Sequence, residues 1–202
     1  MKRIAFLFFV VALVALASCG GKGEKFVIKG TTTQSRLNGE QVFLVPFGGK
    51  HIEDSIGVDS VVIKDNKFEF TGRGEYMARI TISMKVRYGT QDLLVVTEGG
   101  GVINVVIDSV SHGGGTPQNE ALEQWKTRKI SHDMAVGPHV ARLFRMRRGG
   151  DSINAKPLED SLREFNEAFR QDVLGITKVL GKGTVYDFLM KRYGDSPEPK
   201  AE

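Results

Sequence analysis

The chain changes its pattern of hydrophobic and polar residues twice. Residues 4–16 form an unbroken apolar run, "IAFLFFVVALVAL". From Lys25 onward, short segments of alternating apolar and polar residues are separated by turn residues, a pattern typical of strands. After residues 113–115, a glycine triplet, apolar residues recur every three or four positions, as they do in amphipathic helices. The pattern therefore predicts an apolar leader, a β-rich part and a helical part, in that order.

Seven short segments of the β-rich part are predicted strands: 26–29, 42–45, 58–64, 67–70, 78–84, 93–97 and 102–108. Asp65-Asn66 separates the third segment from the fourth, which predicts a hairpin. The last two segments are almost continuously apolar, so we expect both of their faces to be buried. The glycine triplets 99–101 and 113–115 are predicted turns. Together these features predict an antiparallel β-sandwich or open barrel of about seven strands for residues 25–115.

Residues 116–193 are predicted to be helical. Thr116 and Pro117 suit the N-cap and the first position of a helix, and we expect Gly137-Pro138 to interrupt that helix before a second stretch, 139–148. The clearest apolar stripe has spacings of 4, 3, 4, 4 and 3, and its members are Leu158, Leu162, Phe165, Phe169, Val173 and Ile176. A last short helix from Thr184 to Tyr193 precedes residues 194–202, which we expect to be disordered. The predicted fold class is α+β, a β-domain followed by a C-terminal helical appendage.

The first 18 residues have the three parts of an export signal peptide. Met1-Lys2-Arg3 is basic, residues 4–16 are apolar, and Ala17-Ser18 are small residues at a processing site. The alternative is an uncleaved membrane anchor, but an anchor needs about 20 apolar residues and this run is shorter. We therefore expect residues 1–18 to be removed.

Cys19, the only cysteine in the chain, directly follows this leader. Leu16-Ala17-Ser18-Cys19 resembles the lipobox of bacterial lipoproteins. The resemblance implies that the Cys19 thiol carries lipid, and that residues 19–24 are a short tether to the membrane. A structural or redox role is disfavoured, because one cysteine cannot form an internal disulfide. By the same resemblance, the lack of an aspartate right after Cys19 favours the outer membrane, with the protein facing the periplasm.

The body of the chain also resembles a known domain. The resemblance rests on short glycine-based motifs: Phe26 to Gly30, Gly39, Lys67-Phe68-Glu69-Phe70 with Gly72, Glu98-Gly99, and Gly115-Thr116-Pro117 with Asn119. Over about residues 25–128 the chain is similar to a domain of unknown function. That domain precedes the thioredoxin module in envelope thiol-disulfide oxidoreductases of the TlpA and AhpC/TSA type. The resemblance implies a β-rich domain followed by helices. It does not imply redox chemistry, because the Cys-x-x-Cys of the thioredoxin module is absent from this sequence. We therefore expect the β-domain here without that module.

Composition and charge add few constraints. Apolar residues make up 41% of the chain, enough for a core, and a chain starting at Cys19 keeps 26 basic and 24 acidic residues. This balance indicates no particular partner, and an export signal argues against nucleic acid. Residues 126–148 are the exception, with seven basic residues and one acid, Asp133. They form either a solvated face balanced by the acids of residues 158–172, or a contact for anionic headgroups or another envelope polymer.

Candidate chemical groups are sparse. His51, His112, His132 and His139 lack the close spacing of metal ligands, so we expect neither a metal nor a cofactor. Glu53-Asp54 and Glu159-Asp160 are interpreted as surface residues, and no Gly-x-Ser-x-Gly motif is present. The sequence therefore predicts no catalytic residues. It predicts a non-enzymatic, lipid-anchored envelope protein that binds a ligand or protein partner or acts as a scaffold. The alternative is an auxiliary of envelope thiol-disulfide systems without its own redox centre. The oligomeric state is left open.

Overall fold

The computed structural model describes residues 23–47, 58–83 and 85–194. The leader, Cys19 with the tether as far as Lys22, and the tail from Asp195 lie outside the described residues, as do His51 and Glu53-Asp54. Within the described residues, eight strands are followed by three helices. This arrangement confirms the predicted α+β class.

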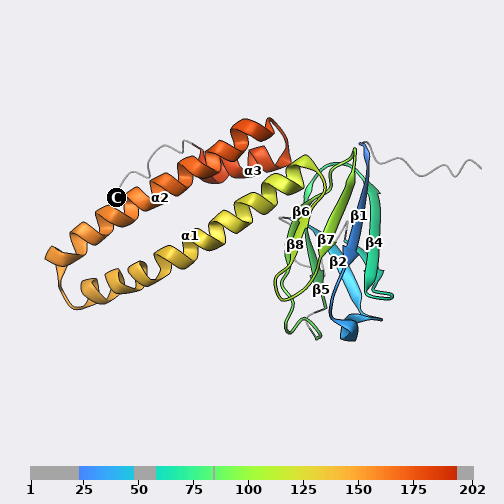
Figure 1. The fold of residues 1–202 in the computed structure, drawn as a ribbon, viewed down its shortest axis with the longest axis horizontal. Coiled ribbons are helices and arrows are strands. Elements are labelled where there is room, and N and C mark those ends of the chain that lie inside the picture. The colour runs from blue at the N-terminus through green and yellow to red at the C-terminus, as the bar shows by residue number, and fades with distance from the viewer. Residues whose placement is uncertain (1–22, 48–57, 84, 195–202) are drawn as a thin grey trace, which may run out of the picture.

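The strands form two open four-stranded sheets rather than a closed barrel (Figure 1). Sheet A has the order β4-β1-β7-β8, with bounds β1 Lys25–Thr31, β4 Lys67–Arg73, β7 Val102–Val106 and β8 His112–Gly114. Sheet B has the order β3-β2-β5-β6, with bounds β2 Gln41–Pro46, β3 Asp59–Val62, β5 Met77–Ile82 and β6 Leu93–Val96. A short 3-10 helix, Ser35–Leu37, follows β1.

Alternate residues of the strands fill one core between the sheets. Phe26 and Ile28 of β1 are buried, while Lys25 and Lys29 point to solvent. The same alternation in the other strands adds Val42, Leu44, Phe68, Phe70, Ile80, Leu93, Ile103 and Val105 to this core. The period of two seen in the sequence is therefore the direct cause of the sandwich.

Four features of the sheets differ from the sequence predictions. β1 and β7 pair in parallel, because the chain crosses to sheet B and returns before β7 forms. The turn at Asp65-Asn66 has the positive φ angles of a hairpin, but β3 and β4 then pair in different sheets. Gly113 and Gly114, which belong to the predicted turn 113–115, lie instead in strand β8 at the edge of sheet A. The outer face of β7 is exposed rather than buried, because no helix covers that side of sheet A.

Two glycines of the motifs make room for aromatic rings across β1 and β4. Phe26 stands opposite Gly72, and Phe68 stands opposite Gly30. A Cβ on Gly30 would lie 2.0 Å from Phe68 Cζ, and a Cβ on Gly72 would lie 2.5 Å from Phe26 Cζ. Each ring therefore occupies the space that a side chain on the opposite strand would need. These motif residues serve packing.

The helices are α1 (Pro117–Arg148), α2 (Ser152–Leu180) and α3 (Thr184–Tyr193). α1 and α2 form an antiparallel hairpin that projects from the sandwich, and α3 folds back against its base (Figure 1). The predicted interruption at Gly137-Pro138 is wrong, since α1 runs through both residues. Pro138 lies on the exposed side of α1, where the carbonyl of Met134 that it leaves unpaired is able to bond water.

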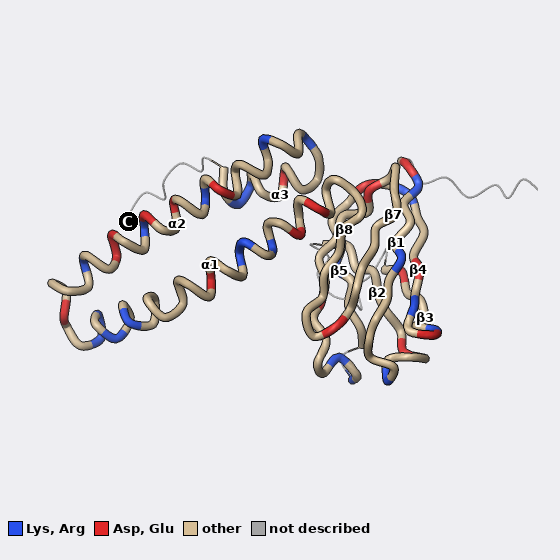
Figure 2. Tube along the Cα trace, viewed as in Figure 1, with Lys and Arg blue, Asp and Glu red and all other residues tan. Residues whose placement is uncertain are grey.

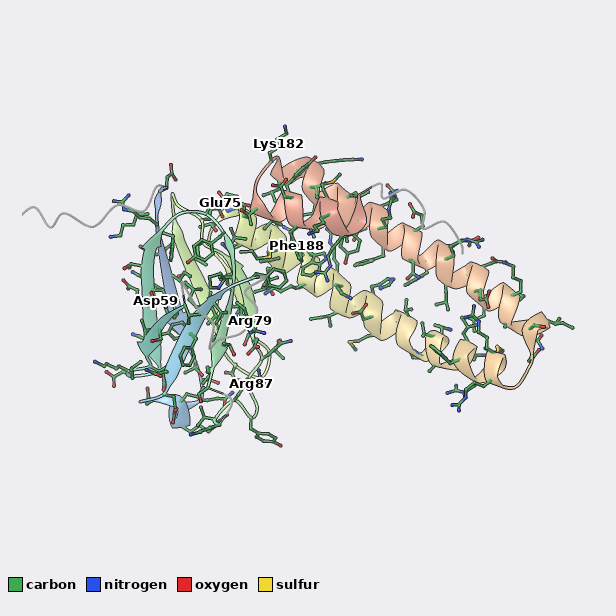
Figure 3. The ribbon with its side chains drawn as sticks, turned by 180° about the vertical axis from the view of Figure 1, so that it is seen from behind. Asp59, Glu75, Arg79, Arg87, Lys182 and Phe188 are labelled. Carbon is green, nitrogen blue, oxygen red and sulfur yellow. The ribbon has the colours of Figure 1, made fainter. Side chains whose placement is uncertain are left out.

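A second hydrophobic cluster fixes the base of the hairpin to sheet B. It joins Met77 and Val96 of the sheet to Leu122 and Trp125 of α1, together with residues of α2 and α3. Phe188 of α3 packs edge-on against both Phe47 and Trp125 (Figure 3). Both hydrophobic clusters consist of residues between Phe26 and Tyr193. None of the described helices is long and apolar enough to cross a membrane.

Candidate functional site

The first two turns of α1 cover the open edges of both sheets. The buried carboxamide of Asn119 accepts from Val96 N at 2.9 Å and donates to Val96 O at 2.8 Å, as a neighbouring strand would. On the other edge, Glu120 Oε1 accepts from Gly115 N at 2.7 Å, and Glu123 Oε2 accepts from Gly113 N at 3.1 Å. α1 therefore satisfies the polar backbone groups that β6 and β8 would otherwise leave unpaired.

Carboxylates from the β-domain bind the starts of two helices. Glu98 Oε2 accepts from Gln118 N at 3.0 Å, near the N-terminus of α1. Glu75 Oε1 accepts from both the amide and the hydroxyl of Thr184 at the start of α3, at 3.0 and 2.6 Å (Figure 3). The hydrogen bond from Thr184 is the main cause that holds the pKa of Glu75 below its ordinary value. Negative charge at a helix N-terminus is favourable, so these contacts stabilise the attachment of α1 and α3 to the β-domain.

An open groove of about 1180 Å³ crosses the outer face of sheet A. Its floor is two rows of outward-facing residues set by the strand register. One row is Glu69, Lys29, Asn104 and Gly114, and the next is Lys67, Thr31, Val106 and His112. Glu120 and Glu123 of α1 form one wall of the groove. The groove exists because β8 carries glycines and because the helices cover the other sheet.

The groove offers hydrogen-bond donors and acceptors. The exposed ammonium groups of Lys29 and Lys67 form no ion pair with any described residue. Asn104 and Thr31 are able both to donate and to accept, and Glu69 accepts. The carboxylates of Glu120 and Glu123 are already held by backbone amides of residues 113–115.

The outer face of sheet A lies within a segment that matches a known domain. A family model described as "Domain of unknown function (DUF4369)" matches residues 26–122, and these residues are similar to that domain. The match ends at Leu122, within α1, so it includes Asn119 and Glu120 but not Glu123. No curated protein and no solved structure matches the chain.

The three described histidines do not form a cluster. His112 is on β8 in the groove of sheet A, and His139 is an exposed residue of α1. His132 lies between the helices, where its ring stacks on Phe169 at 4.2 Å and on Phe165 at 5.5 Å. The part of the chain that the structure describes holds no group of three or more His, Cys, Asp or Glu side chains able to bind a metal.

The basic stretch of α1 is only partly neutralised. Arg128 and Arg147 bind acids of α2, Asp172 at 2.6 Å and Glu159 at 2.8 Å, while Lys126 and Lys129 bind acids of α1. Asp160, beside Glu159, binds Lys156 and Arg163, as expected for surface carboxylates. Within the described ranges, no ion pair involves the other three arginines, which gather near the end of α1: Arg142, Arg145 and Arg148 (Figure 2).

The sequence did not identify the groove of sheet A. The alternation of apolar and polar residues along β1 and β7 does predict from the sequence that Lys29 and Asn104 face outward. No local signal tells which sheet the helices cover, because that depends on contacts such as Val96 with Leu122. Cys19, the predicted lipid site, lies outside the described residues.

Proposed function

We propose that this protein is a lipid-anchored, non-enzymatic binding module of the cell envelope. Cys19 is its lipid attachment point, and the outer membrane is its location, with the folded part facing the periplasm. The support is the order of a basic start, an apolar run and Leu16-Ala17-Ser18-Cys19. A Cys19→Ser variant should lose labelling by radioactive palmitate and retention in the membrane fraction, with an unchanged circular dichroism spectrum for the folded part. Retention of that variant in membranes would refute the anchor.

The single observation that carries the binding role is the groove on the outer face of sheet A. Its floor presents Lys29, Lys67 and Asn104 to solvent across three strands. Neither lysine forms an ion pair with a described residue, and Asn104 donates one N–H to Val102 O at 3.4 Å, which leaves its other N–H and its carbonyl for a ligand. We infer that its ligand is an envelope glycan with carboxylate groups. A glycan presents many hydroxyl and amide groups to such a surface, and carboxylates suit the lysines.

The test is a titration of residues 20–202 with soluble peptidoglycan fragments, followed by amide chemical shifts. Shifts should cluster on β1, β4 and β7. Lys29→Ala should weaken binding about tenfold, since a hydrogen bond to a charged group contributes about 1.5–3 kcal/mol. Lys25→Ala is the matched control, because Lys25 lies on the same strand and face but outside the groove. Equal effects of the two variants, or chemical-shift changes on other elements, would refute ligand binding in the groove.

A second candidate is an auxiliary role in envelope thiol-disulfide chemistry, through a separate oxidoreductase. Its support is the resemblance of residues 25–128 to the domain that precedes thioredoxin modules in TlpA-type proteins. Loss of the protein should then change the ratio of reduced to oxidised thiols in the envelope. An unchanged ratio would end this candidate.

A further inference from the structure

α1 carries two apolar stripes, and only one of them is covered. The inner stripe faces α2, where His132 stacks on Phe169 and Val136 is buried. The outer stripe consists of Ile130, Met134, Gly137, Ala141 and Phe144, all exposed. Its three large side chains are strongly exposed, Ile130 to 50%, Met134 to 73% and Phe144 to 64%. Ile130 also borders a hollow that it shares with Gln91 and Val110 of the β-domain, and among the described residues the rest of the stripe lies on the part of α1 that runs beside α2 (Figure 1).

The spacing of the outer stripe is that of a helix-pairing seam. Its members recur at intervals of 4, 3, 4 and 3 residues. This heptad spacing keeps side chains along one line of a helix, which matters when a second helix lies alongside it. The middle of the seam is small, and a Cβ on Gly137 would meet no atom within 4 Å. A second helix backbone is therefore able to approach closely there.

We propose that the outer stripe of α1 is covered by α1 of a second copy of this chain, in antiparallel orientation. A twofold axis near residue 139 sets Met134 of one copy opposite Phe144 of the other, and Gly137 opposite Ala141. The same patch serves both copies, so the assembly closes as a dimer. The proposal does not depend on ligand binding to the groove.

The charge of α1 selects this orientation. Residues 142–148 carry four arginines and no acid, whereas residues 130–136 carry one acid, Asp133, and no lysine or arginine. A parallel pair would set the two arginine-rich segments against each other. The antiparallel pair with its axis near residue 139 sets residues 142–148 of each copy against residues 130–136 of the other, which contain Asp133.

The size of the seam predicts a dimer that dissociates on dilution. Residues 130–148 span about 28 Å of helix. Two such helices bury on the order of 1,000 Å² in total, at the lower end of specific interfaces. The dimer should therefore form in the micromolar range, and attachment of both copies to one membrane would raise their local concentration.

Sedimentation equilibrium of residues 20–202 tests the proposal. From about 2 to about 200 µM the mass should rise from one chain to two. Met134→Ala should raise the dissociation constant at least tenfold, because each copy would lose a large apolar side chain from the seam without gaining a charge. Ile153→Ala is the matched control, since Ile153 is 84% exposed but lies at the start of α2, off the seam. Circular dichroism should show both variants folded.

Spin labels determine the orientation. Residues 20–202 contain no cysteine, so Thr127→Cys and Arg142→Cys each give one labelling site. An antiparallel dimer separates the two Thr127 labels by about 36 Å along the axis but the two Arg142 labels by only about 9 Å. A parallel dimer gives similar short distances at both positions and would overturn the proposal.

Other outcomes would also overturn it. One is a single chain at every concentration. A second is an equal effect of Met134→Ala and Ile153→Ala. A third is a monomer that sediments with phosphatidylglycerol vesicles and loses this property in Met134→Ala, because the stripe would then bind lipid instead of a second copy.

Discussion

We expect replacement of Asn119 to lower the free energy of unfolding by a large amount for so small a side chain. Its carboxamide is 3% exposed and pairs with both backbone groups of Val96, which is fully buried. Replacement by alanine leaves a buried N–H and a buried C=O without partners. Each unpaired group costs about 1–3 kcal/mol, and entry of water lowers the total, so we expect Asn119→Ala to destabilise the fold by about 3 kcal/mol.

Urea unfolding of residues 20–202, followed by circular dichroism, measures this loss. The midpoint should fall without a change in the slope, and the melting temperature should drop by about 6–12 °C, since 1 kcal/mol corresponds to about 2–4 °C at this size. Asn166→Ala is the control, because Asn166 is exposed on α2, and its effect should stay within about 0.5 kcal/mol. A loss below about 1 kcal/mol for Asn119→Ala would refute the edge-covering role.

The Asn119→Asp variant separates the two hydrogen bonds. The aspartate keeps an acceptor for Val96 N–H but sets a second oxygen against Val96 C=O. At neutral pH it also buries a charge, so it should be less stable than Asn119→Ala. Protonation at low pH restores a donor, and the difference between the two variants should then shrink. A difference that does not depend on pH would contradict this geometry.

Three further predictions concern single contacts. Gly30→Ala should cost about 2 kcal/mol, and the cost should shrink in a Phe68→Leu background, because the Phe68 ring occupies the space of the new Cβ; urea unfolding of the double-mutant cycle measures this coupling. Gly175→Ala, where the new Cβ meets no atom, should stabilise α2 by about 0.5–1 kcal/mol in the same assay. Hydrogen bonds from Thr33 and Gln34 lower the pKa of Asp108 to about 2, so the folded state holds its charge where the unfolded state takes up a proton. Stability should therefore fall as the pH drops from about 4 to about 2, and Asp108→Asn should remove that part of the fall when unfolding is measured against pH.

Much of the fold could be predicted from the sequence because its cause is local. The alternation of Phe26 with Val27, and of Phe68 with Glu69, specifies strands with one buried face wherever they pair. The stripe from Leu158 to Ile176 likewise specifies α2. The helix break expected at Pro138 was wrong because the cost of a proline depends on its surroundings. At an exposed position, water is able to bond the carbonyl left unpaired.

The sequence by itself determined the alternating strands and the long amphipathic helix, since side-chain periodicity acts within one element. The lipid-anchor proposal also rests on the sequence alone, because Cys19 lies outside the described residues. Only the tertiary structure decided that β1 lies parallel to β7, that Asn119 completes the edge of β6, and that the outer face of sheet A stays open as a groove. Each of these features depends on contacts between segments that are far apart in the chain. Which segment covers which face or edge is decided by the packing of the whole core, and no local pattern of residues specifies it.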